Sequence, residues 1–462
     1  MELGQVFERF SQETPVSVMV RGLMEKILSP QKLDQLFENY RQNQYTKELM
    51  FSTIVEMMSL VICGIYPSIH SVYQAKSKEI NVSVTSIYNK LNATDPILSA
   101  QLVRETAQEM EATIRYLQGT LPDSIPGHRI KILDGNTLGA TEHRLKPLRS
   151  CNSAPLPGQS LVVLDPSLML AIDVFPCEDG HAQERSLLPD VIKTVEEDDV
   201  WIADRNFCTL NFLEEIASRS AFFVIREHKC LPKQTRETFR YIGTVEEGKV
   251  FEQTISISDE GGYLSQIRRI KLILSEPTRD GAQEIFILTN LSSNQANPLL
   301  VAKLYRKRWT IETLFQILTV TFNCEIKTLG YPKAALLAFC LALVAYNLIS
   351  VVLAALRAVH GTEIVQKEVS SYYLALEISG TYRGMMIAIP PTQWKFFGQL
   401  NFLELTNYLR DLAKKVNLKT FQRHARGPKK IRSKMKRVRP KKKPHVSTNK
   451  ILTQNMLKKP TP

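Results

Sequence analysis

An apolar segment from Ala334 to Leu356 restricts the folds open to this chain more than any other feature of the sequence. Only Tyr346, Asn347 and Ser350 interrupt it. At about 1.5 Å per residue, a helix of this length is roughly 35 Å long, which is enough to cross a bilayer. The alternative is a helix buried on all sides in a large domain. The central asparagine, the many small residues and the lack of a second such segment favour the buried helix and predict no membrane association.

The basic charge of the chain is concentrated at one end. The 462 residues carry a formal net charge of +13, yet residues 412–462 hold 18 Lys and Arg and no Asp or Glu. The rest of the chain has 41 basic against 46 acidic residues and is mildly acidic. A basic tail of this kind predicts an anionic partner. The seven cysteines are scattered without a C-x-x-C pair, which argues against a disulfide framework or zinc site and for a reducing compartment.

Hydrophobic periodicity divides the chain into segments of different type. Residues 1–125 predict an all-α N-terminal domain. Within it, residues 80–91 resemble the second helix of a helix-turn-helix with Ser83 or Thr85 as its cap, although an ordinary capped helix of a bundle fits equally well. Beyond residue 125 strands and helices alternate, with one helix expected from about Glu184 to Val195, which predicts an α/β fold. The expected parts are a first α/β part over 126–228, a β-rich insertion over 229–291, a helical second part over 292–375, a C-terminal helical region over 376–421 and a basic, disordered tail over 422–462.

A long helix is predicted from about Pro298, and one of its faces is chemically unusual. At about 100° per residue, Tyr305, Arg308, Glu312 and Gln316 share one stripe, while the opposite side is apolar. The simpler interpretation is a solvated helix face with an i,i+4 Arg–Glu pair, which is worth about 0.2–0.5 kcal/mol.

Two aspartates mark the ends of predicted strands. Asp134 ends the strand over 129–134, and Asp204 follows the strand over 200–203. If these strands pair, both carboxylates emerge at one edge of the sheet, where Glu312 could join them. Three converging acids repel one another unless a cation lies between them, and hard Mg²⁺ suits such oxygen ligands. Asp134 could instead be a turn residue, Asp204 could form a local ion pair with Arg205, and Asp173 is a rival ligand.

Three motifs in order resemble the DDE transposases of bacterial insertion sequences. They are Asp134-Gly135-Asn136-Thr137, the run from Trp201 to Phe207, and Tyr305-x2-Arg308-x3-Glu312. The resemblance extends from about Ile130 to Leu356 and is to the IS-four-like group, which has a Tyr-Arg-Glu-Lys signature.

The resemblance implies a ribonuclease H-like mixed sheet with helices, interrupted by the β-rich insertion between the second and third acids. It implies cut-and-paste transposition of double-stranded DNA, in which the transposon ends are hydrolysed and their 3′-OH groups are joined to target DNA. Asp134, Asp204 and Glu312 would be catalytic and would hold two Mg²⁺ ions, with Mn²⁺ as a substitute. Tyr305 and Arg308 would contact the DNA backbone of the transposon end.

One position departs from the family pattern. The lysine of the signature should follow Glu312 by seven residues, but Thr319 stands there, and Lys327 lies outside the register. The sequence therefore also permits a catalytically inactive or repurposed DNA-binding protein derived from a transposase.

Further expectations concern DNA affinity and location. Arg205, within the second motif, and the tail residues Lys429, Lys430 and Arg432 are predicted to bind DNA, the tail residues without sequence preference; a solvated tail with incidental polyanion affinity is the alternative. The family implies a homodimer on DNA, since two transposon ends are paired. The expected location is the bacterial cytoplasm, in association with the nucleoid.

Overall fold

The centre of the molecule is one mixed β-sheet. The computed structural model describes residues 4–42, 44, 48–235, 237–259, 262–278, 281–424 and 444–457. The strands are β1 (Arg129–Thr137), β2 (Ala154–Leu156), β3 (Gln159–Asp165), β4 (Leu170–Cys177), β5 (Asp199–Ala203), β6 (Phe222–Arg226), β7 (Lys233–Thr235), β8 (Arg240–Val245), β9 (Gly248–Asp259), β10 (Gly262–Leu274), β11 (Glu284–Thr289) and β12 (His445–Ser447). Ten of them form one sheet in the order β4-β3-β1-β5-β6-β11-β10-β9-β7, with β8 paired to β9.

The first half of this sheet combines antiparallel and parallel pairing. β1, β3 and β4 form an antiparallel meander, whereas β5 pairs parallel to β1 and β6 parallel to β5. The side chains of β1 alternate between two apolar cores: Ile130 and Ile132 face one, and Leu133 faces the other. The second core includes residues of α8 (Leu188–Ile192) and α9 (Leu210–Ser218), so helices cover both faces of the sheet.

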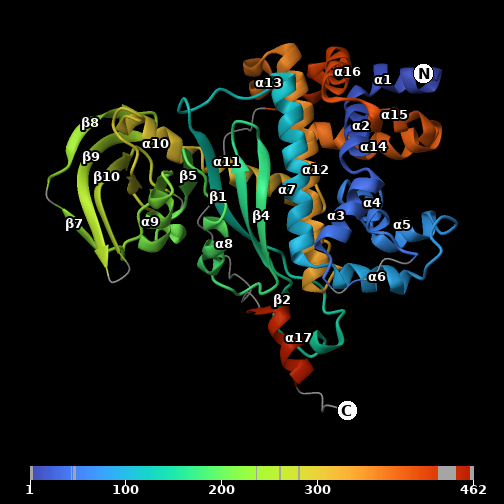
Figure 1. The fold of residues 1–462 in the computed structure, drawn as a ribbon, viewed down its shortest axis with the longest axis horizontal. Helices are drawn as coiled ribbons and strands as arrows, with labels where there is room; N and C mark the ends of the chain where they lie inside the picture. The colour runs from blue at the N-terminus through green and yellow to red at the C-terminus, as the bar shows by residue number, and fades with distance from the viewer. Residues whose placement is uncertain are drawn as a thin grey trace, which may run out of the picture.

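The β-rich insertion extends the same sheet. β11 pairs antiparallel with β6, so the strands of the insertion continue the hydrogen-bonded order instead of forming a sheet of their own. Figure 1 shows β7 to β10 as a curved group at one end of the molecule, with α9 and α10 (Pro298–Arg306) beside it.

The apolar segment forms α12 (Pro332–His360), and it is a core helix. In its most apolar 18-residue window, 94% of the residues are buried within the protein. α7 (Pro96–Leu117), α4 (Phe51–Ile62), α16 (Phe402–Lys415) and β4 pack around it. It is the one helix in the described part of the chain that is long and apolar enough to cross a membrane, and its surroundings are those of the buried-helix alternative.

The polar residues of α12 form hydrogen bonds with backbone groups of β4, of the turn before β4 and of the segment after α7. The Ala171 N–H of β4 donates to Asn347 Oδ1, and Asn347 Nδ2 donates to the Ala171 carbonyl, each over 2.8 Å. Ser350 Oγ donates to the Met169 carbonyl (2.6 Å), and Arg357 Nε to the Gly119 carbonyl (2.7 Å). These bonds fix the edge strand β4 and the end of α7 against the central helix.

The helical half of the molecule joins segments that are far apart in the chain, since α14, α15 and α16 pack against α2 (Figure 1). α7 also packs on β4, and the N-terminal helices share one core with the sheet. The predicted boundary at 375/376 falls within α14. The remaining helices are α1 (Gln5–Glu13), α2 (Pro15–Ile27), α3 (Pro30–Tyr40), α5 (Ile69–Ala75), α6 (Val84–Ala93), α11 (Trp309–Val320), α13 (Thr362–Glu368), α14 (Ser371–Ala388), α15 (Lys395–Gln399) and α17 (Thr448–Leu457), with short 3₁₀ turns η1 (Lys146–Leu148), η2 (Glu184–Leu187), η3 (Arg205–Phe207), η4 (Pro391–Gln393) and η5 (Leu418–Phe421).

The segment that resembled a helix-turn-helix forms α6. Ser83 is its N-cap, and its hydroxyl accepts from the Ser86 N–H (3.2 Å). Ile87 and Leu91 are buried, while Thr85 and Ser86 of the first turn are exposed. Residues 76–83 separate α5 from α6, which is longer than the three- or four-residue turn of the motif.

Part of the predicted disordered tail is ordered. β12 pairs parallel with β2, and the Lys450 ammonium of α17 lies 3.1 Å from an Asp179 carboxylate oxygen. The prediction of disorder over 422–462 is therefore wrong for residues 444–457, because a strand from elsewhere in the chain supplies backbone partners that composition does not reveal.

Candidate active site

Asp134 and Asp204 lie just beyond the parallel pairing of two neighbouring strands. The last residues paired between β1 and β5 are Leu133 and Ala203, so each aspartate is the next residue along. Because parallel strands present their carboxyl ends at one edge of a sheet, both side chains emerge together. Asp134 follows the alternation of β1 and lies on the same face as Ile132, the face on which α11 packs.

The helix that carries the third motif is broken. α10 ends at Arg306 and α11 begins at Trp309, so the prediction of one continuous helix through Tyr305 and Glu312 is wrong. Lys307 and Arg308 keep helical dihedral angles, but their bonds are of the i,i+3 type: the Arg308 N–H donates to the Tyr305 carbonyl (3.1 Å). The motif side chains still meet despite this tighter turn.

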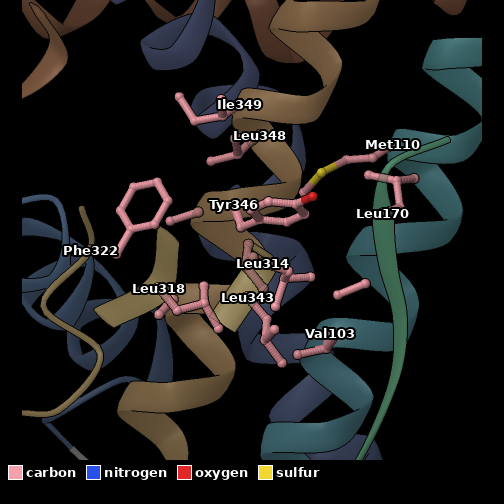
Figure 2. Close-up of a cluster of buried hydrophobic side chains, with 14 of the residues drawn as sticks. Val103, Met110, Leu170, Leu314, Leu318, Phe322, Leu343, Tyr346, Leu348 and Ile349 are labelled. Carbon is pink, nitrogen blue, oxygen red and sulfur yellow. The ribbon is translucent and has the colours of Figure 1, made fainter. Parts of the chain in front are cut away.

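The core fixes α11 in place. Leu314 and Leu318 of α11 enter the same buried cluster as Leu343 and Tyr346 of α12, as Figure 2 shows. Glu312 is on the exposed side of α11, and 53% of its side chain is accessible. The position of the third acid is therefore determined by apolar packing on the opposite face of its helix.

One arginine joins two of the three acids. Arg308 Nη1 lies 2.8 Å from Asp134 Oδ2, and Nη2 lies 2.6 Å from Glu312 Oε1. The Tyr305 hydroxyl donates to Asp204 Oδ1 (3.3 Å). The Arg308 side chain is 12% exposed, and its Nε is buried without a hydrogen-bond partner. A side-chain hydrogen bond between Tyr305 and Arg308 joins these two sets of contacts. The five side chains thus form one connected group, although they come from β1, the end of β5, α10 and α11.

Burial and charge shift several pKa values in this group. Burial raises the pKa of Asp134 to about 6; the Arg308 charge and the Gly135 N–H oppose this rise, and the Asp204 and Glu184 carboxylates add to it. Burial likewise raises the pKa of the Tyr305 hydroxyl. Burial alone would lower the pKa of Arg308, but the anionic groups around it raise the pKa. The guanidinium therefore stays charged and offsets part of the carboxylate repulsion.

One further residue of the site, Glu184, carries no motif that marks it in the sequence. Glu184, the first residue of η2, accepts a hydrogen bond from Asn206 Nδ2. A Cβ placed on Gly135 would lie 2.0 Å from Glu184 Oε1, so only glycine leaves room for this carboxylate. The expected helix over 184–195 is instead η2 followed by the short α8, and this change of structure brings Glu184 to the site.

The other predicted residues have varied surroundings. Arg205 is exposed at the start of η3, next to Asp204. Asp173, the rival ligand, is instead paired with Arg104 of α7 (2.5 Å). Thr319 is exposed, and its hydroxyl donates to the Phe315 carbonyl (2.9 Å). The predicted DNA-binding residues of the tail lie outside the described residues: Lys429, Lys430 and Arg432.

The donor set suits a divalent cation in kind but is not arranged as a metal cage. Its oxygen donors are carboxylates from three separate elements, which is the chemistry that Mg²⁺ and Mn²⁺ prefer. Within the described ranges, no three His, Cys, Asp or Glu side chains are grouped closely enough to hold an ion. A positive charge nevertheless already lies between Asp134 and Glu312, namely the guanidinium of Arg308. The three carboxylates therefore fit a divalent cation once Arg308 no longer forms ion pairs with Asp134 and Glu312.

Comparisons with known proteins bear on this group of side chains. Residues 126–348 match the family model described as "Transposase DDE domain". Comparison with curated proteins gave no match. Among solved structures, a cryo-EM structure of the piggyBac transposase synaptic complex with hairpin DNA aligns at 13% identity over 88% of this chain and 86% of that chain, with a TM-score of 0.40. A TM-score this low establishes neither a shared fold nor a shared function.

The matched family segment contains all three predicted acids together with Tyr305 and Arg308. The match does not distinguish one group of insertion sequences from another. It supports a DDE transposase as the class to which this protein is similar.

Proposed function

We propose that this protein is a cut-and-paste DNA transposase that hydrolyses double-stranded DNA at transposon ends and joins the freed 3′-OH groups to target DNA. The observation that carries the proposal is the contact of Arg308 with Asp134 and Glu312, together with that of Tyr305 with Asp204. These residues come from three motifs far apart in the sequence, within the segment that matches a transposase domain.

Each of the five side chains has a role in the proposal. Asp134, Asp204 and Glu312 would hold two Mg²⁺ ions, or Mn²⁺ in their place. Such ions activate water near neutral pH and neutralise charge on the attacking and leaving oxygens of a phosphodiester. Arg308 would bind a backbone phosphate, which a guanidinium can engage with two hydrogen bonds, and Tyr305 would hold Asp204 in place beside it.

A DNA phosphate would also change the contacts of Arg308. In the DNA-free structure the guanidinium is engaged by two carboxylates, and a phosphate oxygen would compete with them for the same N–H groups. Once Arg308 binds DNA, Asp134 and Glu312 each lose the one ion-pair partner that they have among the described residues. DNA binding and metal binding would then support each other.

The fold is consistent with the proposal of a ribonuclease H-like core in the IS-four-like group. In support, β1, β3 and β4 form a meander, β5 and β6 follow in parallel beside β1, and the first two acids lie directly after the last paired residues of β1 and β5. The β-rich insertion falls between Asp204 and Glu312, where the resemblance to that group expects it.

The proposal extends to assembly and location. Joining two transposon ends requires two active sites, so we propose a homodimer on DNA, in association with the nucleoid in a bacterial cytoplasm. Short inverted repeats around the reading frame, bounded by small direct repeats, would identify the DNA substrate.

A nicking assay on terminal inverted-repeat DNA tests the proposal. The wild-type protein should cut this DNA with Mg²⁺ or Mn²⁺ and bind without cutting in EDTA. Asp204→Asn should abolish cutting and leave DNA binding intact, because it removes a carboxylate from the site and preserves the shape of the side chain. Asp190→Asn is the matched control, since the exposed Asp190 carboxylate has, in the part of the chain that the structure describes, one ion pair, with Lys193 beside it (2.7 Å).

The outcome separates the two functions that the sequence permits. If the wild type binds the inverted repeat but cuts with neither metal, the protein is a catalytically inactive DNA-binding derivative. Restoring the family pattern with Thr319→Lys then shows whether that position is the cause.

A further inference from the structure

Asp134 and Asp204 lie where the backbone pairing of β1 and β5 has already ended. The ladder stops at Leu133 and Ala203, and β5 itself ends there. On its other side, β1 still pairs with β3, since Asp134 is opposite Val162. Asp204 begins a 3₁₀ turn instead, so the ladder fixes the first aspartate more firmly than the second.

A short segment spans the gap between these strand ends. Glu184 of η2 accepts a hydrogen bond from Asn206 Nδ2, and the next residue, Arg185, donates from Nε to the Asn206 carbonyl. Both the side chain and the backbone of Asn206 are therefore held by two adjacent residues. Asn206 belongs to η3, the turn whose N-cap is Asp204.

The same Glu184 carboxylate lies against β1 at Gly135, the residue after Asp134. Its Oε1 occupies the space that a Cβ on Gly135 would fill, at 2.0 Å from the ideal Cβ position. Gly135 is also held by its own neighbour, since its N–H donates to Asp134 Oδ1 (2.9 Å). One carboxylate thus packs against the residue after Asp134 and binds the second residue after Asp204.

The geometry points to Glu184 as a positioning residue that holds the turn after β5 against Gly135 of β1 and so sets the separation of Asp134 and Asp204. This inference rests on the proposed function for its consequence, because the separation of two carboxylates matters for holding a cation. Glu184 acts through Asn206 and is not itself assigned a contact with DNA or metal.

The hydrogen bond between Glu184 and Asn206, called the clamp below, should distinguish between side chains at position 184. Glu184→Gln keeps an acceptor oxygen on a side chain of the same length, so it should still receive the bond from Asn206. Glu184→Ala removes the acceptor, and Asn206→Ala removes the donor. These two variants should behave alike, and combining them should add little, because each breaks the same bond.

Two measurements test the clamp, and the first needs neither DNA nor metal. Amide hydrogen exchange of peptides covering 204–208 should quicken by about tenfold in Glu184→Ala and Asn206→Ala, with peptides of β3 unchanged, and should remain at the wild-type rate in Glu184→Gln. The second is Mn²⁺ binding followed by electron paramagnetic resonance in the presence of uncleavable end DNA. Its dissociation constant should rise by about tenfold in the two alanine variants, as for other residues that orient ligands, and recover in Glu184→Gln. Asp190→Asn is again the control.

The results separate this inference from the proposed function. If the wild type neither binds Mn²⁺ nor cuts DNA, the proposed function fails, while hydrogen exchange still decides whether the clamp exists. If exchange over 204–208 is unchanged in Glu184→Ala, the inference is overturned, whether or not the protein cuts DNA. It is also overturned if Glu184→Gln loses as much Mn²⁺ affinity as Glu184→Ala, because the negative charge would then be the essential property.

Discussion

Replacing Asn347 with leucine tests how the central helix is joined to the sheet. Asn347 is completely buried and forms two hydrogen bonds of 2.8 Å with the peptide groups of Ala171. β4 is at the end of the sheet order, so no further strand can take over these bonds. Leucine has a similar volume and avoids a cavity, which leaves the loss of the two bonds as the main change.

The expected cost follows from the two groups left behind. A buried polar group without a partner costs about 1–3 kcal/mol, so the Ala171 N–H and carbonyl together predict a loss of about 2–6 kcal/mol. This is a large fraction of the ~5–15 kcal/mol by which a protein is normally stable. Ser350→Ala is the graded comparison, because it removes one hydroxyl, which donates to the Met169 carbonyl (2.6 Å) and also lies 3.2 Å from the Tyr346 carbonyl of its own helix, and it should cost about 1 kcal/mol.

Urea denaturation and hydrogen exchange measure the effect together. A chain of this size need not unfold in one step, so exchange of a peptide covering 168–173 shows whether the loss is local to β4. Asn347→Leu should lower the denaturation midpoint and increase exchange of this peptide more than Ser350→Ala does. A leucine variant as stable as the wild type would refute the argument, since it would mean that the bonds to Ala171 contribute nothing net.

Three further predictions concern charge. Because the pKa of Asp134 is raised to about 6, the folded state keeps a proton that the unfolded chain releases between about pH 4 and 6, so the free energy of unfolding falls as the pH rises through this window. In EDTA, Asp134→Asn should therefore be more stable than the wild type by about 1–3 kcal/mol at pH 7.5 and equal to it near pH 3.5. Thermal scans that find the variant less stable at pH 7.5 would contradict this prediction. Without DNA, Arg308→Gln should bind Mn²⁺ about tenfold more tightly than the wild type, equivalent to ~1.4 kcal/mol, yet it should bind end DNA more weakly. Equal Mn²⁺ dissociation constants for the two proteins would show that the ion pairs of Arg308 do not compete with metal. Alanine at the three basic tail positions Lys429, Lys430 and Arg432 should reduce the slope of log affinity against log salt concentration by up to about 2.7 without changing the sequence preference. Filter binding measures this slope, and an unchanged slope would mean that the three residues do not contact phosphates.

Local patterns in the sequence were sufficient for much of the secondary structure near the site. The alternation over 129–134 and the buried run at 200–203 correspond to β1 and β5, and the apolar segment corresponds to α12. The break between α10 and α11 was not foreseen, because Lys307 and Arg308 keep helical dihedral angles and neither glycine nor proline marks the turn. Helix 184–195 was predicted too long for a related reason, since η2 has i,i+3 bonds that periodicity does not distinguish from an α-helix.

Contacts between distant segments could not be predicted from local sequence patterns. Asp173 and Asp134 both lie on strands and are equally plausible ligands by pattern, and only the position of Arg104 on α7 assigns Asp173 to an ion pair. Glu184 carries no motif, and its place beside Gly135 depends on how η2 returns to the sheet. The order of residues 445–447 depends on β2, nearly three hundred residues earlier in the chain.

By itself, the sequence determined which side chains were chemically suited to the site: three carboxylates, one tyrosine and one arginine, spaced on strand ends and a helical stripe. Hydrophobic periodicity is local, so it specifies elements and the faces they bury. Tertiary structure alone decided that Arg308 lies between Asp134 and Glu312, and that a fourth carboxylate, Glu184, holds the turn after Asp204. Such contacts depend on the relative placement of elements, which is set by the packing of α11 and α12 and by strand pairing, and neither leaves a signal within any short stretch of sequence.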